Sequence, residues 1–306
     1  MKRLAIFASY DVENIVDDYV SYYLSELSKV ADIIYVSDCD MKEKELLKIK
    51  DYVIHIINGR HGEYDFGSYK RGFLYAKDNN LLENYDYLIL CNDSNFGPFF
   101  SLENILDTFD KKNDKAFGIF KHLPIDNFGR NSLKLKALNE HLQSHFLYLH
   151  KDIFLSDWYE DFIYSIKKEK DKKDIIVKYE VGMSALILDK GYSLHSLYED
   201  DTNAPYYAPS KLIKKGYPFL KKDRKDLLLS EIYDILKGIE DSYNISLIDN
   251  YYKRKYYKHF YCKGAILESV KEYLFILRIL QFTIFGIKKY EEYFMLIILG
   301  IKITLK

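Results

Sequence analysis

The chain has 306 residues, and 48% of them are hydrophobic, which is enough for one large domain or for one domain with a smaller appendage. Its 45 basic and 46 acidic side chains leave a formal net charge of −1. This balance argues against a nucleic-acid-binding protein, because such proteins carry a clustered basic excess.

The first hundred residues alternate between short apolar runs and amphipathic segments. Residues 4–9 are typical of a buried parallel strand, and apolar side chains at three- and four-residue steps predict a helix over residues 16–30. The next expected elements are a strand at 32–37, a helix at 41–50, a strand at 52–58, a short helix at about 67–79 and a strand at 87–91. This alternation predicts an α/β fold, with a mostly parallel sheet flanked by helices.

Polar side chains follow three of these expected strands. Asp11 comes after the first strand, Asn58 to Arg60 after the third, and Asn92, Asp93 and Ser94 after the fourth. In open parallel sheets, ligands bind at the carboxyl ends of the strands. We therefore expect residues 1–100 to form a nucleotide-binding half-domain, in which Asp11 either contacts the base or ribose or caps a turn.

The pattern loosens after residue 100. Helices are expected at 102–109, 153–166, 179–188 and 210–216, and strands at 116–120 and 143–149. The chain holds three widely spaced cysteines with no CxxC or zinc spacing, which favours a reducing compartment. The apolar run at the start is also too short for a signal peptide, so we expect a cytoplasmic protein.

The last part of the chain is strongly apolar, with runs at 273–287 and 293–305. Neither run reaches the roughly 20 residues that a membrane-spanning helix needs. We expect residues 241–306 to form a helical carboxyl-terminal region, and two interpretations stay open. The region lies peripherally on the inner face of the cytoplasmic membrane, or it docks as a helix pair on the core or on a second subunit.

Two clusters could carry chemistry. A carboxylate after an apolar strand, such as Asp93, is where many sugar transferases bind the Mg²⁺ or Mn²⁺ that neutralises a diphosphate; here there is one carboxylate rather than two, and an ordinary turn is the alternative. Upstream, Gly67 would let the backbone approach a ligand closely. Lys70 and Arg71 could pair with phosphates, or they are exposed residues of a capped helix.

Five segments resemble the rhamnan synthesis F (RgpF) family. They are ASYDVENIVDDYVSYYLSELSKVADIIYVSD, YDFGSYKRG, NDSNFGPF, HLQSHFLYLHKDIFLSDWYEDF and KYEVGMSALILDKGY, and they lie in this order over roughly residues 1–220. The resemblance implies a GT-A-like transferase that moves a sugar, typically rhamnose from dTDP-L-rhamnose, onto a growing cell-surface polysaccharide or lipid-linked glycan. It also implies a donor site that includes Asp65, Gly67, Lys70, Arg71, Asn92 and Asp93, beside which we place Asp11 and Ser94.

A transferase that inverts the anomeric centre needs a general base for the acceptor hydroxyl. Glu180 is the first candidate, because GT-A enzymes commonly use a carboxylate at the start of a helix that comes late in the domain. The alternative is an ordinary carboxylate at a helix N-terminus, which is stabilised by the helix dipole and has no catalytic role. Asp157 is a second candidate. His145 is a third, although a histidine inside an apolar strand pattern is more often a core residue.

We thus expect a GT-A-like domain at 1–240, with a nucleotide-sugar half at 1–100 and an acceptor half at 101–240. Three alternatives remain. The protein is a transferase for another nucleotide sugar or a polyol phosphate, a non-catalytic component of a polysaccharide synthesis complex, or a nucleotidyltransferase.

Overall fold

The computed structural model describes the whole chain except residues 113, 127–136, 139, 223–228, 240–241, 263–264, 271–272, 280–281, 290–293, 299–300 and 306. Only the backbone is described for 125–126, 137–138, 229–231 and the remaining residues from 256 onward. The chain divides into two compact units, Met1–Arg224 and Lys225–Lys306.

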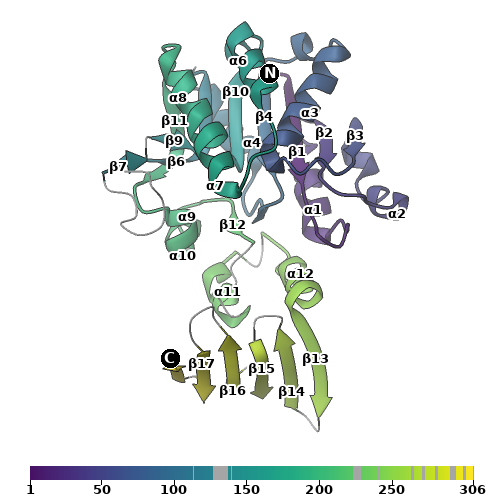
Figure 1. Ribbon diagram of the computed structural model, residues 1–306, viewed down its shortest axis with the longest axis vertical. Coiled ribbons are helices and arrows are strands. Elements are labelled where there is room, and N and C mark those ends of the chain that lie inside the picture. Colours follow the sequence, from purple (N-terminus) through teal and green to yellow (C-terminus); the bar gives the residue numbers. More distant parts are fainter. Residues whose placement is uncertain are drawn as a thin grey trace. The chain divides into compact units, whose positions relative to one another are not determined.

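A central sheet organises the first unit (Figure 1). Its strand order is β11-β6-β10-β4-β1-β2-β3. The bounds are β1 Arg3–Ser9, β2 Asp32–Ser37, β3 His55–Asn58, β4 Tyr87–Asn92, β6 Ala116–His122, β10 Phe146–His150 and β11 Leu194–Asp200. Along this path β10 alone runs antiparallel to its neighbours, and the short β9 (His141–Leu142) adds an antiparallel edge to β6. The expectation of a mostly parallel sheet flanked by helices is confirmed.

Helices cover both faces of the sheet because its strands alternate buried side chains between the two faces. On one face, Phe7 of β1 packs edge-on against Tyr23 of α1 (Asp18–Leu27), with ring centroids 5.1 Å apart. Phe109 of α4 (Leu102–Asp110) stacks on Phe117 of β6 on the same side. On the other face, Ile6 joins a core cluster with α3 (Tyr64–Asp78), α6 (Asp157–Ser165) and the helix over residues 172–189.

The helix over residues 172–189 is continuous and consists of α7 (Lys172–Ile175), η3 (Ile176–Val181) and α8 (Gly182–Asp189). Its first turn is capped by the Asp171 side chain, which accepts hydrogen bonds from the amides of Lys173 and Asp174. The helix therefore begins seven residues before the expected start at residue 179. Its middle segment, η3, is a π-helix.

Helix α3 crosses β1 at Gly72. A Cβ atom on Gly72 would lie 2.4 Å from Cγ2 of Ile6, so only glycine permits this approach of helix to strand. The helix starts at Tyr64, three residues before the expected start, and thereby places Asp65 in its first turn.

Shorter elements complete the first unit. They are α2 Glu43–Leu46, η1 Lys50–Tyr52, η2 Leu82–Asn84, β5 Asn95–Phe96, β7 Ile125–Asp126, β8 Ala137–Leu138, α5 Lys151–Phe154, α9 Ala204–Tyr207, α10 Pro209–Ile213 and β12 Leu220–Lys221. The helix expected at 41–50 is limited to α2 and η1. Strand β11 was not expected, because an edge strand with half-exposed polar side chains lacks the apolar run of a buried strand.

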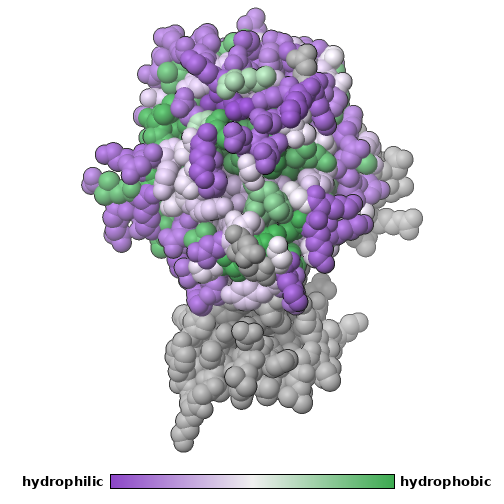
Figure 2. All heavy atoms as spheres, turned by 180° about the vertical axis from the view of Figure 1, so that it is seen from behind, coloured by the Kyte–Doolittle hydropathy of each residue, from purple (hydrophilic) through white to green (hydrophobic). Residues whose placement is uncertain are grey.

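Figure 2 shows one face of the molecule, on which hydrophilic residues cover most of the coloured surface and hydrophobic residues form small separate patches. The large apolar side chains of the first unit lie mainly inside, where the described core includes Phe7, Tyr23 and Phe73.

The second unit contains helices α11 (Leu229–Leu236) and α12 (Ser246–Tyr256) and a six-stranded antiparallel sheet. The strands pair in chain order and are β13 Tyr257–Cys262, β14 Ala265–Val270, β15 Tyr273–Ile279, β16 Phe282–Lys289, β17 Phe294–Ile298 and β18 Ile301–Leu305. The expectation of a helical region over 241–306 holds for α12 only, because strands follow from Tyr257 onward. Short apolar runs rich in Ile and Phe fit strands as well as helices by periodicity, and those residues favour strands.

Among the described residues, no helix combines the length and apolarity that crossing a bilayer would require. The expected membrane contact falls on residues 241–306, and from residue 256 onward the side chains lie outside those described. Peripheral membrane association stays a prediction.

Candidate functional site

The order of the strands changes direction at one place on the sheet, and such a switch point is a common ligand site. Strand β1 lies between β2 and β4, and the chain passes from β1 through β2 and β3 before it returns to β4 on the other side of β1. At such a reversal the loops after the two neighbouring strands lead apart, so the carboxyl ends of β1 and β4 are where a sheet of this kind usually binds its ligand. Ser9 ends β1, and Asn92 and Asp93 come at the end of β4.

Asp93 is buried at this point, with 6% of its surface exposed. Its Oδ2 accepts hydrogen bonds from the Ser9 hydroxyl at 3.0 Å and from the Tyr10 amide at 3.1 Å. Its own amide donates to the Ala8 carbonyl at 3.1 Å. These contacts tie the loop after β4 to the end of β1.

A cation from a distant part of the sequence completes the surroundings of Asp93. The Lys222 ammonium lies 3.2 Å from Asp93 Oδ1 and donates to the Tyr19 hydroxyl at 2.9 Å, while that hydroxyl donates to the Asp93 carbonyl at 3.0 Å. Lys222 is itself buried, with 7% of its surface exposed. The Asp93 carboxylate is therefore part of a buried ion pair.

The amide side chain of Asn92 joins β4 to helix α3. Its Nδ2 donates to Asp65 Oδ2 at 2.9 Å and to the Tyr69 hydroxyl at 3.3 Å. Its Oδ1 accepts from the amide and the hydroxyl of Ser94, which closes the turn after the strand. Asp65 and Tyr69 are four residues apart, so they share one face of α3.

The carboxyl group of Asp65 has a raised pKa of about 6. Burial is the main cause because it penalises the charged form, and the neighbouring charge of Asp93 acts in the same direction. The positive charges of Lys172, Lys221 and Lys222 oppose the rise. The site thus holds two carboxyl groups within the field of three lysines.

Glu180 lies on the π-helical segment η3 and is connected to the same network. Its Oε2 accepts from the Ser144 amide at 2.8 Å and also from the Ser144 hydroxyl, and its Oε1 lies 3.8 Å from Nε2 of His141. The carbonyl of Ser144 accepts from the Tyr69 hydroxyl at 2.8 Å. A chain of hydrogen bonds therefore runs from Asn92 through Tyr69 and Ser144 to Glu180.

The position of Glu180 differs from the expected one. Glu180 does not open a helix but lies inside the continuous helix over 172–189. Single π-helical segments within α-helices occur frequently at functional sites, because the extra residue turns the following side chains to a new direction. The candidate base is thus set in an irregular helical segment that faces the loop before β10.

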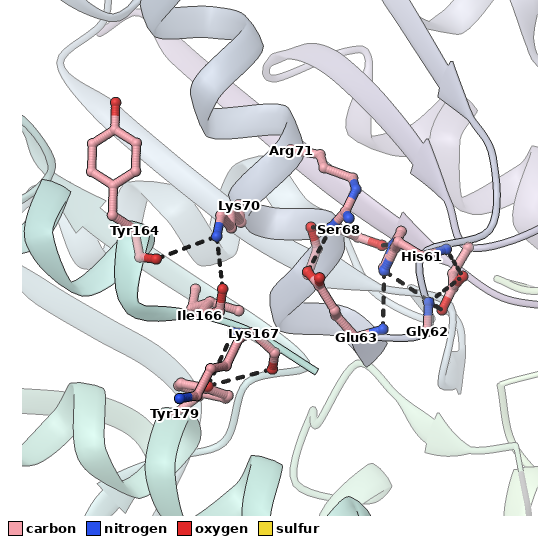
Figure 3. Close-up of polar contacts among 12 residues, drawn as sticks. His61, Gly62, Glu63, Ser68, Lys70, Arg71, Tyr164, Ile166, Lys167 and Tyr179 are labelled. Atoms are coloured by element: carbon pink, nitrogen blue, oxygen red, sulfur yellow. Dashed lines mark hydrogen bonds and ion pairs between the residues drawn. The ribbon is translucent and has the colours of Figure 1, made fainter. Parts of the chain in front are cut away.

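Lys70 and Arg71 point away from each other (Figure 3). The Lys70 ammonium donates to the carbonyls of Tyr164, at 3.3 Å, and Ile166, at 2.7 Å, at the end of α6. Arg71 donates to Glu63 Oε2 at 2.7 Å and to the Gly67 carbonyl. Both side chains therefore donate hydrogen bonds to other groups of the protein.

Gly67 lies where the first turn of α3 meets the loop before it. A Cβ atom there would lie 2.3 Å from Cβ of Glu63 and 2.9 Å from the His61 ring. The His61 ring bonds Ser68 through Nε2 and accepts the Glu63 amide at Nδ1 (Figure 3). Burial is the largest cause that lowers the pKa of His61, so this ring is neutral near pH 7 and Gly67 serves its close packing.

The remaining predicted residues lie in different surroundings. Asp11 is buried, and its Oδ1 accepts from the amides of Glu13 and Ile15, which is the capping arrangement that the sequence left open. Asp157 is exposed in the first turn of α6. This helix follows the end of β10, which pairs with the start of β4. Asp157 is therefore not brought to the Asn92 cluster.

His145 is a buried core residue. Its Nε2 pairs with the Tyr217 hydroxyl at 2.9 Å, and its ring packs against Phe219. Burial sets its pKa well below the ordinary value, so it stays neutral.

Sequence reasoning missed Tyr69, Ser144 and Lys222. The four-residue step from Asp65 could have indicated Tyr69, because that step joins one helix face. No local pattern marks Ser144 or Lys222, since both reach the site only when strands that are distant in the sequence pair.

The residues at Asp93 do not fit a divalent metal site. Both carboxylate oxygens already bond protein donors, one of them a positively charged ammonium. In the described part of the chain, no three His, Cys, Asp or Glu side chains gather as a metal-binding group.

The fold and site define an α/β protein with a buried polar cluster at the switch point of its sheet. The model of the family described as rhamnan synthesis protein F matches residues 33–279. This is most of the chain, and the protein belongs to that family.

A curated relative, described as uncharacterized protein y4gN of Sinorhizobium fredii, is 23% identical over 195 residues. The match covers 64% of this chain and 48% of the relative, so the chain spans about half the length of the curated relative it matches.

Several solved structures are similar to parts of this chain. The Saccharomyces cerevisiae mannosyltransferase Ktr4p in complex with GDP matches with a TM-score of 0.35 and 9% identity, covering 55% of this chain and 61% of that one. A cytidylyltransferase from Leptospira borgpetersenii matches with a TM-score of 0.38 and 12% identity, covering 82% and 98%. A 4-diphosphocytidyl-2C-methyl-D-erythritol synthase matches with a TM-score of 0.41 and 8% identity, covering 65% and 90%.

Proposed function

We propose that this protein is a glycosyltransferase that moves a sugar from a nucleotide-activated donor onto a growing cell-surface polysaccharide or a lipid-linked glycan. Membership of the rhamnan synthesis protein F family supports polysaccharide synthesis and favours dTDP-L-rhamnose as the donor. The single observation that carries the proposal is the hydrogen-bonded chain from Asn92, at the switch point, to Glu180. This chain of hydrogen bonds links the end of β4, where the donor would bind, to Glu180, the candidate general base.

The donor would lie across the carboxyl ends of β1 and β4. The loop after β1 carries Tyr10, which is 48% exposed and offers a flat apolar face to a nucleoside base. The diphosphate would lie toward Asn92 and Ser94, within the field of Lys172 and Lys221, because cationic side chains stabilise phosphate oxygens.

Glu180 would act as the general base of an inverting transfer. In this step the acceptor hydroxyl oxygen forms a bond to the anomeric carbon, and the bond from that carbon to the diphosphate oxygen breaks. The hydroxyl proton passes to Glu180 as the nucleoside diphosphate leaves with the bonding electrons. Ser144 holds Oε2, so Oε1 is the oxygen that would receive the proton.

Melting measurements with a panel of nucleotide sugars test the donor. Stabilisation by dTDP-L-rhamnose supports the proposal, and stabilisation by a CDP-linked donor alone would replace rhamnose with another transferred group. If no donor raises the melting temperature and no transfer occurs, with or without Mn²⁺, the non-catalytic alternative is favoured.

Glu180→Gln tests the base. This variant should lose transfer by roughly 10²- to 10⁴-fold, which is the usual contribution of a general base, while donor binding stays unchanged. Asp157→Asn is the matched control, because Asp157 is exposed and the structure does not bring it to the Asn92 cluster. Full activity of Glu180→Gln in a folded protein would remove Glu180 from the mechanism.

A further inference from the structure

We propose that this site binds the donor diphosphate without a divalent metal ion, because the Lys222 ammonium takes the place beside Asp93 that such an ion would fill. The inference rests on the proposed function for the identity of the ligand. It concerns the way in which the site of this chain balances negative charge.

The first step is the occupancy of the Asp93 carboxylate. Ser9 and Tyr10 donate to Oδ2, and Lys222 lies against Oδ1. A Mg²⁺ ion would require an Asp93 oxygen at about 2.0–2.1 Å and near-octahedral geometry. It would therefore displace the ammonium or lie against it, and two cations in one buried contact repel each other strongly.

The second step is that Lys222 is held in position by the backbone. Strand β12 pairs with β5 through Leu220 and Phe96, and the amide of Lys222 donates to the Ser94 carbonyl at 3.0 Å. The ammonium also bonds the Tyr19 hydroxyl. A lysine fixed at its backbone and at its ammonium is a built part of the site rather than a surface side chain that happens to lie near.

The third step is the charge balance of the site. Asp65 and Asp93 bring two carboxyl groups, and the charges of Lys172, Lys221 and Lys222 all act on Asp65. Lys222 pairs with Asp93 and balances its charge, and the charges of Lys172 and Lys221 add to the positive field at Asp65. The lysines thus supply the positive charge that a metal ion would otherwise bring.

Isothermal titration of the full chain with dTDP, and separately with inorganic pyrophosphate, tests the inference. Each ligand is titrated in EDTA, in Mg²⁺ and in Mn²⁺. We expect the affinity for dTDP to agree within about twofold across the three conditions, since metal would add no contact. A gain of tenfold or more in Mn²⁺ would overturn the inference and leave the proposed function standing, whereas no binding of either ligand in any condition would overturn the inference and remove dTDP-L-rhamnose as the donor.

Variants of Lys222 test whether this particular lysine, rather than the overall positive charge of the protein, supports dTDP binding. Lys222→Met should weaken dTDP binding at least tenfold in EDTA, and Lys222→Arg should retain most of it, because arginine keeps the positive charge. Lys151→Met is the control, since Lys151 pairs with Asp86 at the other end of β4. If Lys222→Met fails to fold, Asp93→Asn takes its place. This variant keeps the Lys222 charge in the site, so dTDP affinity in EDTA should not fall. Unchanged dTDP affinity in a folded Lys222→Met, or a tenfold loss in Asp93→Asn, would overturn the inference.

Discussion

The ammonium of Lys222 lies 3.2 Å from Oδ1 of Asp93, and both side chains are more than nine-tenths buried. The pair joins the turn that follows β4 to the segment that follows β12. Because the Tyr19 hydroxyl bonds both the ammonium and the Asp93 carbonyl, helix α1 belongs to the same arrangement. A single ion pair therefore connects three separate parts of the first unit at the site.

Removing one partner of this pair should destabilise the protein more than removing both. Lys222→Met leaves the Asp93 carboxylate buried without its cation, so we expect the free energy of unfolding to fall by about 3 kcal/mol. The double variant Asp93→Asn/Lys222→Met should lose less than Lys222→Met alone. Urea unfolding of the wild type, both single variants and the double variant measures the coupling. Strictly additive losses would contradict a buried pair.

Asp65 should make stability depend on pH. Its pKa is raised to about 6 in the folded protein, so between pH 4 and 6 the native state binds more protons than the unfolded state. The stability that the protonated group contributes is present below about pH 4 and is lost as the pH rises through 6.

Asp65→Asn removes this dependence and keeps an oxygen to accept from Asn92. The variant should gain stability relative to the wild type as the pH rises from 4 to 7, by on the order of 2 kcal/mol. Urea unfolding at pH 4, 5, 6 and 7 provides the measurement. Parallel pH profiles for the two proteins would show that Asp65 titrates normally.

Tyr69→Phe should separate positioning from binding. The change removes the hydroxyl that bonds the Ser144 carbonyl and the Asn92 side chain, but it keeps the buried ring. We expect kcat for sugar transfer to fall by about tenfold, as Glu180 loses the network that orients it, with little change in the donor Kd. Tyr75→Phe, on the same helix but stacked on His55, is the control. An equal effect of both variants would argue for a general loss of helix packing.

Gly72→Ala should destabilise the packing of helix α3 on strand β1. The new methyl group would overlap the Ile6 side chain, so α3 must move from β1 at a cost of about 1–3 kcal/mol. Gly59→Ala is the matched control, because no atom lies within 4 Å of a Cβ placed there. Thermal and urea unfolding compare the two variants, and equal stabilities would mean that the helix can shift freely.

Lys70→Met distinguishes a structural lysine from a phosphate-binding one. Lys70 donates to two carbonyls at the end of α6, so its loss should lower the free energy of unfolding by about 1 kcal/mol and leave dTDP affinity unchanged. Calorimetric titration together with urea unfolding reads both quantities. A clear loss of dTDP affinity at unchanged stability would restore the phosphate role that the sequence suggests.

The sequence by itself determined the alternating α/β framework and the edge of the sheet where polar residues gather. Asp32–Ser37 was predicted to the residue, because a buried parallel strand is a continuous apolar run that periodicity detects. The sequence also singled out Asn92, Asp93 and Glu180 as candidates, since they follow or lie within recognisable apolar segments.

Only the tertiary structure decided what these residues contact. Lys70 and Arg71 are neighbours in a basic motif, yet one reaches α6 and the other Glu63, because successive residues on a helix point in different directions. Lys222 meets Asp93 through the pairing of β12 with β5. Contacts between distant segments depend on how strands pair, and no local pattern records that pairing. Asp93, which the sequence suggests as a metal ligand, is therefore paired with Lys222 in the structure.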